Sequence, residues 1–398
     1  MRFAITFVAR WLVLLLLLSL PAPTPAHADD LRGTGNLGLV IERATGSVLI
    51  VDTTSRKAIG RVEGLGDLSH ASAVFSADQR YAYVFGRDGG LTKVDLLTAS
   101  IARRIVQAGN SIGGAISDDG ELIAVSNYEP GGVRVFDAQT LDPIASIAAV
   151  GANGKTSKAL GLVDLPGRRF AFALYDAGEI WIADLSAAEA PVVTKLTGVG
   201  KLPYDGNVTP DGRHYLAGLF GEDGVVHVDT WQTPLKAERI LNGYGRGEEA
   251  LPVYKMPHLE GWAAVGDWLL LPAVGHHELI ALDLRNFSEA GRVATYGQPV
   301  FAVARPDGRH VWVNFAHPLN DTIDVVDTLT MKVVHRFAPG PAVLHMEFTP
   351  RGNEVWVSVR DADRVDVYDA ATFAKKAEIP AQKPSGIFFT ARATRIGQ

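Results

Sequence analysis

One histidine stands out as a candidate metal ligand. His70 ends the stretch Gly66-Asp67-Leu68-Ser69-His70, which lies between two apolar segments. A neutral imidazole suits iron or zinc when a second group, such as Asp67 or a backbone carbonyl, orients its other nitrogen. The chain has no cysteine and no His-x-x-x-His or similar pair, so a metal cage made of protein ligands alone is not expected. Two roles follow for His70: an axial ligand to a cofactor metal, or a polar residue hydrogen-bonded within its loop.

Two arginines occupy equivalent positions in adjacent repeat units. Arg43 and Arg87 each follow an apolar segment and precede a turn. A guanidinium pairs bidentately with a carboxylate, so two of them in one cavity suit a ligand with several carboxylates. The alternative is an ordinary salt bridge to Glu42 or Asp88. A single ligand carrying both a metal and carboxylates would use His70 and both arginines together.

Tyr204 and Asp205 form a candidate acid–base pair. A buried tyrosine hydroxyl beside a carboxylate can hold or pass a proton. The alternative is a turn with an exposed aspartate. Three further candidate cofactor-binding residues lie on loops expected at the same face of the molecule: Asp176, His258 and Arg360.

The remaining histidines are weaker candidates. His214 and His310 follow Asp-Gly-Arg turns, which predicts exposed turn residues on the opposite face. His276 and His277 are adjacent at a strand edge, so at most one of them can face a central cavity. His317 precedes a proline, and we expect it to have a packing role.

A repeat positions these residues. An aspartate closes a short apolar strand every 42 to 54 residues, at Asp52, Asp95, Asp137, Asp184, Asp229, Asp283, Asp327 and Asp369. Such a period is typical of propeller blades. The sequence therefore predicts an all-β, eight-bladed β-propeller.

Each blade is expected to contain four antiparallel strands, A to D from the hub outward. A turn such as Pro210-Asp211-Gly212 joins A to B, and the repeated aspartate ends C. The first unit has no A strand, and Ile387–Arg392 resembles Met346–Arg351, which opens the last unit. The C-terminal segment should therefore pair into blade one and close the ring. The loops from B to C and from D to A then share one face, where the candidate residues lie.

Composition narrows the function classes. The 398 residues are 47% hydrophobic with a formal net charge of −6 and no basic block, which argues against nucleic-acid binding. Without cysteine the chain can form no disulfide and attach no c-type haem. Residues 1–28 have the layout of a cleavable signal peptide, with two arginines, an apolar run and Ala26-His27-Ala28. We expect export to the periplasm and one propeller domain over residues 29–398.

Three stretches carry a family resemblance: Ile41–Gly46, Gly66–Ser72 and Tyr83–Gly89. They resemble the d1-haem-binding propeller of cytochrome cd1 nitrite reductase, and most closely its cysteine-free branch that takes part in d1-haem biosynthesis. The resemblance covers essentially the whole chain after the leader. It implies that His70 matches the proximal iron ligand, and that Arg43 and Arg87 match arginines near the d1-haem carboxylates.

The chain departs from the reductase on the distal side. The reductase has a Leu-His-Asp-Gly stretch, whereas this chain has Leu202-Pro203-Tyr204-Asp205-Gly206, with tyrosine in place of the histidine. His258 resembles a second distal histidine. The lost histidine and the missing c-type haem domain argue against nitrite reduction.

The resemblance implies non-covalent binding of d1 haem or its dihydro precursor, an iron tetrapyrrole, and a late maturation step that serves denitrification. That step could be an oxidation of a side chain or of the macrocycle, which would make the chain an oxidoreductase. The implied partners are other d1-haem maturation proteins, a periplasmic c-type cytochrome and cytochrome cd1 nitrite reductase. The alternatives are a non-catalytic carrier and a cofactor-free propeller that binds proteins. A lactonase or quinoprotein would need a carboxylate-rich metal site or a quinone clamp, and the sequence offers neither.

Overall fold

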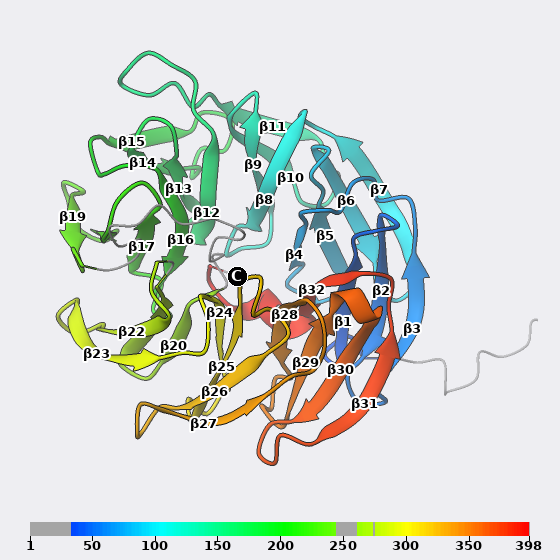
Figure 1. The fold of residues 1–398 in the computed structure, drawn as a ribbon. Helices are drawn as coiled ribbons and strands as arrows, with labels where there is room; N and C mark the ends of the chain where they lie inside the picture. The colour runs from blue at the N-terminus through cyan, green and yellow to red at the C-terminus, as the bar shows by residue number, and fades with distance from the viewer. Residues whose placement is uncertain (1–32, 244–260, 274, 398) are drawn as a thin grey trace, which may run out of the picture. The chain divides into compact units, whose positions relative to one another are not determined.

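The repeat forms a ring of β-sheets around a central hub (Figure 1). The computed structural model describes residues 33–243, 261–273 and 275–397. Thr34–Gln398 form one compact unit, separate from Met1–Gly33. Within the described residues there are eight four-stranded antiparallel sheets, so the predicted eight-bladed propeller is confirmed. The expected signal peptide, residues 1–28, lies outside the described residues.

The first four blades take their strands in chain order, except for one strand of blade one. Blade one contains β32 (Pro384–Phe389), β1 (Leu37–Glu42), β2 (Ser47–Asp52) and β3 (Lys57–Val62). Blade two contains β4 (Ser72–Phe75), β5 (Tyr81–Phe85), β6 (Gly90–Asp95) and β7 (Ser100–Val106). Blade three contains β8 (Asn110–Ile116), β9 (Leu122–Glu129), β10 (Gly132–Asp137) and β11 (Pro143–Ile147). Blade four contains β12 (Ala159–Leu165), β13 (Arg169–Leu174), β14 (Glu179–Asp184) and β15 (Val192–Leu196).

The other four blades complete the ring. Blade five contains β16 (Pro203–Val208), β17 (His214–Leu219), β18 (Val225–Asp229) and β19 (Ala237–Ile240). Blade six contains β20 (Ala263–Val265), β21 (Trp268–Pro272), β22 (Glu278–Asp283) and β23 (Ser288–Ala294). Blade seven contains β24 (Pro299–Ala304), β25 (His310–Phe315), β26 (Ile323–Asp327) and β27 (Lys332–Phe337). Blade eight contains β28 (Val343–Phe348), β29 (Glu354–Val359), β30 (Arg364–Asp369) and β31 (Lys375–Pro380), with the 3-10 helix η3 (Arg360–Ala362) between β29 and β30.

The C-terminal strand closes the ring as predicted. β32 pairs antiparallel with β1, with Gly38 opposite Phe389 and Leu39 opposite Phe388. This pairing gives the first blade its inner strand and covers the edge of β1 that would otherwise be unpaired. The chain then continues into a second 3-10 helix, η4 (Thr390–Thr394).

The repeated aspartates act locally. In each blade the Oδ1 atom of the aspartate that ends strand C accepts the N–H of the residue two positions on, at 2.8–3.0 Å. This side-chain cap replaces a backbone hydrogen bond and fixes the turn into strand D. The period visible in the sequence is thus the period of the C–D turns.

Apolar side chains fill the spaces between neighbouring blades. The largest fully buried side chains include Trp181, Trp312 and Trp356, all less than 2% exposed. The Trp312 ring lies 5.5 Å from the Phe337 ring and 6.0 Å from the Phe348 ring, which ties blades seven and eight together. We call the face with the A–B and C–D turns the turn face, and the face with the B–C and D–A connections the loop face. No helix in the described parts of the chain has the length and hydrophobicity to cross a bilayer.

Candidate functional site

Hydrogen bonds from Arg43 and Arg87 hold the loop that carries His70. His70 lies on the loop face, directly before β4, and is half-buried. The Arg43 guanidinium donates a hydrogen bond to the Ser69 carbonyl oxygen. The Arg87 backbone N–H donates to the Asp67 carbonyl oxygen at 2.8 Å. The chain therefore brings the imidazole and both arginines to one place, although they come from three different connections.

The Asp67 carboxylate faces these arginines and its own loop. It accepts the Ser69 N–H at 2.8 Å. Hydrogen bonds from Ser69 lower the pKa of Asp67, and the charges of Arg87 and Arg43 act in the same direction. Asp67 thus stays ionised and organises the loop that presents His70.

The salt bridges considered as alternatives for the two arginines are made by other arginines. Glu42 pairs with Arg61 at 2.8 Å, and Asp88 pairs with Arg104 at 2.7 Å. Both pairs lie toward the outer strands of their blades. The hub-side arginines, Arg43 and Arg87, are therefore not explained by these carboxylates.

Arg360 brings a third guanidinium to the same region. It lies at the start of η3 and pairs with its neighbour Asp361, with Nε–Oδ1 at 2.8 Å. Burial lowers the pKa of Arg43, and the positive charge of Arg360 lowers it further. Two like charges held together in a half-buried place favour an anionic ligand, because a carboxylate would relieve their repulsion.

A group of tyrosines faces the hub from blades three, four and five. The hydroxyls of Tyr128 and Tyr204 are 3.4 Å apart, and the Tyr175 ring meets the Tyr204 ring edge-on at 6.0 Å. Asp205 beside them is 7% exposed. Burial raises the pKa of Tyr204, and the charge of Asp205 raises it further, so the phenol stays protonated at neutral pH.

The tyrosine group and the arginines share one site. Burial raises the pKa of Tyr128, while the positive charge of Arg87 lowers it and the negative charges of Asp205 and Asp176 raise it. Tyr128 therefore lies between the arginine side and the tyrosine–aspartate side of the hub. Tyr128 is not among the candidate residues predicted from the sequence. Its position at the B–C end of β9, equivalent to Arg43 and Arg87, is the signal that could have found it.

Irregular inner strands aim these side chains. The pairing of β16 with β17 shifts between Pro203 and Gly206, so Tyr204 and Asp205 occupy a bulge within the strand instead of the loop that we expected. A bulge re-aims adjacent side chains. Gly161 in β12 has a positive φ of 57°, and a Cβ there would lie 2.7 Å from the Tyr204 carbonyl oxygen. Only glycine permits this close approach.

One buried polar atom at this end of the hub has no protein partner. Asn110 begins β8, and its Oδ1 atom is buried without a hydrogen bond from any described residue. Buried acceptors are normally satisfied, so this atom is suited to a ligand donor or a water molecule. The donor set thus comprises one imidazole, clustered guanidiniums, protonated phenols and an open acceptor. It fits a planar, metal-bearing group with carboxylate substituents.

The other residues predicted from the sequence are not part of this donor set. The Asp176 carboxylate binds Lys158, at 3.1 Å from Nζ and 3.0 Å from the backbone N–H, which gives it a structural role. His258 lies outside the described residues. His276 is half-buried and His277 and His317 are exposed.

The turn-face histidines differ from the prediction. His214 and His310 were expected to be exposed turn residues, but both are half-buried between blades. His214 Nδ1 lies 2.9 Å from Nε2 of His227, and the His227 ring stacks on Phe287 of the next blade at 3.9 Å. Aromatic residues from the neighbouring C–D turn cover these positions, which a single blade repeat does not reveal.

Comparison with known proteins agrees with the site chemistry. Residues 32–393 match the family described as Cytochrome D1 heme domain. The chain belongs to the cytochrome D1 heme domain family, and within it to the NirF proteins. It is 56% identical to Protein NirF of Pseudomonas aeruginosa over 374 residues, covering 94% of this chain and 95% of that protein. It is 54% identical to Protein NirF of Stutzerimonas stutzeri, covering 96% and 98%.

A solved structure of a family relative has the same fold. Dihydro-heme d1 dehydrogenase NirN in complex with DHE superposes with a TM-score of 0.79 at 26% identity, over 93% of this chain and 78% of that chain. The curated dihydro-heme d1 dehydrogenase of Pseudomonas aeruginosa is 29% identical, over 93% of this chain and 73% of its own length.

Proposed function

We propose that this chain is a periplasmic d1-haem biosynthesis protein that binds d1 haem or its dihydro precursor non-covalently across the hub at the loop face. The family, the NirF relatives and the propeller solved with DHE support this proposal. Residues 1–28 would be the cleaved leader that directs export. The mature protein would hand its ligand to, or receive it from, other d1-haem maturation proteins and cytochrome cd1 nitrite reductase.

The observation that carries the proposal is the joint anchoring of the His70 loop. The Arg43 guanidinium donates to the carbonyl of Ser69 and the Arg87 backbone N–H donates to the carbonyl of Asp67, so the loop that carries His70 is tied to both arginine segments. In the proposed complex His70 would hold the iron of the tetrapyrrole through its imidazole. Arg43, Arg87 and Arg360 would bind the carboxylates of the tetrapyrrole.

The opposite side of the ligand would face the tyrosine group. Tyr204 keeps its proton at neutral pH, so its hydroxyl can donate a hydrogen bond to a ligand oxygen. Asp205, nearly buried beside it, is the proposed proton acceptor. Tyr128 would hold the Tyr204 hydroxyl through the 3.4 Å contact between them.

Two kinds of late maturation step fit this arrangement. In an oxidation, a saturated side chain of the precursor would lose two protons and two electrons. Asp205 would take one proton, solvent would take the other, and two oxidised c-type cytochromes docking in turn would each take one electron. The iron of the bound tetrapyrrole would supply the redox centre. In a carrier role, the site binds and releases the ligand unchanged. The absence of cysteine favours the carrier, because the chain cannot attach a c-type haem of its own.

Absorption spectroscopy tests the binding site. Purified protein should bind added d1 haem with shifted absorption bands, and His70→Ala should shift those bands again and weaken the complex. His277→Ala is the matched control, since His277 is an exposed histidine on the same face. Protein that leaves the spectrum of free d1 haem unchanged would overturn the proposal in favour of a cofactor-free protein-binding propeller.

A turnover assay separates the enzyme from the carrier. The dihydro precursor is incubated with protein and an excess of oxidised c-type cytochrome. Loss of the precursor bands with cytochrome reduction, slowed in Tyr204→Phe and Asp205→Asn, would establish oxidation. A bound but unchanged precursor spectrum, with release to apo nitrite reductase, would establish the carrier.

A further inference from the structure

The chain does not end with the strand that closes the ring. After β32 it continues through η4 and residues 395–397, and Figure 1 shows this last segment at the centre of the ring. In the other seven blades the inner strand turns directly into its neighbour. In blade one the neighbour of the inner strand is β1, which comes from the other end of the chain, so the backbone after β32 leaves the sheet and continues into η4.

The segment is firmly fixed where it leaves blade one. The buried Thr390 hydroxyl donates to the backbone oxygens of Thr34 at 2.8 Å and Leu37 at 3.0 Å. Arg392 then forms an ion pair with Glu347 of β28, with Nε–Oε1 at 3.0 Å and both side chains 6% exposed. A buried pair of this kind holds its position strongly, because separating the partners leaves a charge unpaired.

The far end reaches blades four and five with fewer contacts. Ile396 packs against their apolar core. The Gly397 N–H donates to Asp164 Oδ1 on β12 at 2.8 Å. Gly397 has a φ of +75°, and a Cβ there would lie 2.1 Å from Val208 Cγ1 on β16. The segment therefore spans from blades eight and one to blades four and five.

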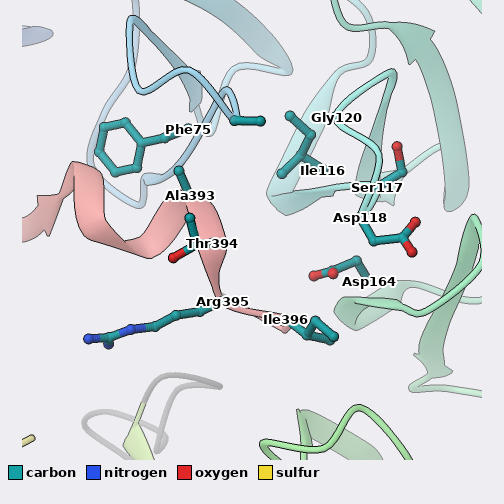
Figure 2. A pocket seen from close by; sticks show the side chains of 11 residues that line it. Phe75, Ile116, Ser117, Asp118, Gly120, Asp164, Ala393, Thr394, Arg395 and Ile396 are labelled. Atoms are coloured by element: carbon teal, nitrogen blue, oxygen red, sulfur yellow. The ribbon is translucent and has the colours of Figure 1, made fainter. Parts of the chain in front are cut away.

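A hollow lies beneath the middle of the segment (Figure 2). Its volume is about 430 Å³ including the open mouth. One wall is residues 393–396, and the other consists of residues from blades two to four: Phe75, Ala77, Ile116, Ser117, Asp118, Gly120 and Asp164. In Figure 2 the Arg395 side chain points away from Asp118 and Asp164. Thr394 and Arg395 are exposed, whereas Ala393 before them packs against the apolar core of blades one and two.

We propose that residues 390–397 form a strap that closes the hub at the turn face, and that it opens from its Gly397 end. The anchored end, at Thr390 and Arg392, stays in place, and the exposed pair at 394–395 is the hinge. A ligand bound at the loop face then enters and leaves through the loop face alone. That last consequence rests on the proposed function, whereas the strap itself does not.

The strap is tested first without any ligand, by hydrogen–deuterium exchange of the full chain. Amides of residues 393–397 in wild-type protein should be protected. Gly397→Ala, which drives a Cβ into Val208, should speed their exchange more than about tenfold and leave the blade peptides unchanged. Gly167→Ala is the matched control, because Gly167 has a similar φ of +81° on the same face but nothing within 4 Å.

Ile396→Ser provides a second variant, since it removes the apolar contact without adding bulk. Unprotected amides at 393–397 in the wild-type protein, or unchanged exchange in both variants, would overturn the strap.

The lack of cysteine permits a test of access to the hub. In Val208→Cys protein the single thiol lies beneath Gly397 and should react slowly with a thiol reagent. Adding Ile396→Ser should speed the reaction by about the same factor as it speeds the exchange.

Release of d1 haem is then timed in wild type, Gly397→Ala and Gly167→Ala. Faster release only in Gly397→Ala supports closure by the strap, and equal release shows that the strap does not govern ligand exit. A protein that binds no d1 haem would refute the proposed function and leave the exchange and thiol results to decide the strap.

Discussion

Charged groups are paired differently on the two faces of the propeller. On the turn face each repeated aspartate caps a backbone turn, and several also bind an arginine, as Asp229 binds Arg213 at 2.6 Å. On the loop face like charges approach each other, as Arg360 does Arg43, with Asp67 and Asp361 as partial compensation, and half-buried phenols share one small region with Asp205. Charged groups fully paired within the chain stabilise the fold, whereas groups that are only partly compensated indicate a place for a ligand. The predictions below test whether this division holds.

The largest expected effect is on the turn face, at the buried ion pair. Glu347→Ala should destabilise the protein by about 3–5 kcal/mol, because it leaves the Arg392 charge buried and uncompensated. Urea denaturation monitored by tryptophan fluorescence measures this loss. The double variant Glu347→Leu with Arg392→Met should recover most of the stability. A small loss in the single variant would show that the turn face is not held together by internal pairing.

On the loop face we expect a substitution to weaken ligand binding more than it weakens the fold. Arg43→Gln should weaken d1-haem binding by about 1.5–3 kcal/mol, the usual value of a charge-assisted hydrogen bond. The unfolding free energy should change little, because relief of the repulsion from Arg360 offsets the lost hydrogen bond to the Ser69 carbonyl and the lost attraction to Asp67. Titration followed by absorption gives the affinity, and denaturation gives the stability. Arg61→Gln is the control, because Arg61 pairs with Glu42 away from the hub. This variant protein should be less stable but should bind d1 haem with unchanged affinity.

Lowering the pH should destabilise the protein through the histidines that lie between blades on the turn face. Burial lowers the pKa of His227 to about 4. The charges of His214 and Arg213 also lower this pKa, whereas those of Glu238 and Asp229 raise it. The folded pKa lies below that of the unfolded chain, so the stabilisation is present above pH 6.5 and is lost as the pH falls from 6.5 to 4. We expect this loss to be about 1–2 kcal/mol.

His227→Gln should flatten that part of the pH–stability curve. Unfolding curves between pH 4 and pH 8 provide the measurement. A wild-type curve with the same slope as the variant would show that the histidine pair carries no linked proton.

The smallest effect is expected at a single turn cap. Asp137→Ala removes the acceptor of the N–H groups of Gln139 and Thr140 and should cost about 1 kcal/mol. The d1-haem affinity should be unchanged, because this turn is on the face opposite to His70. Thermal unfolding together with the absorption titration checks both expectations. An altered affinity would mean that the two faces are coupled.

Much of the fold could be predicted because its signals are local. The aspartate period marks the C–D turns and gives the blade count, and the likeness of Ile387–Arg392 to Met346–Arg351 predicts the ring closure. The placement of candidates on the loop face also follows from strand order. Tyr128 was missed because tyrosine at a strand end carries no distinctive spacing. The interblade positions of His214 and His310 were missed because their neighbours, such as Phe287, belong to the next repeat.

By itself the sequence determined the number of blades, the turn chemistry and the strand that closes the ring, since each depends on residues within one repeat or on a match between two repeats. Only the tertiary structure decided which side chains meet. Closing the ring brings residues of blades eight, one and two together, and strand pairing within each blade assigns Glu42 and Asp88 to the outer arginines Arg61 and Arg104. The crossing of the hub by the C-terminal strap has the same origin, because its contacts join residues as far apart as Asp164 and Gly397, whose meeting no local pattern records.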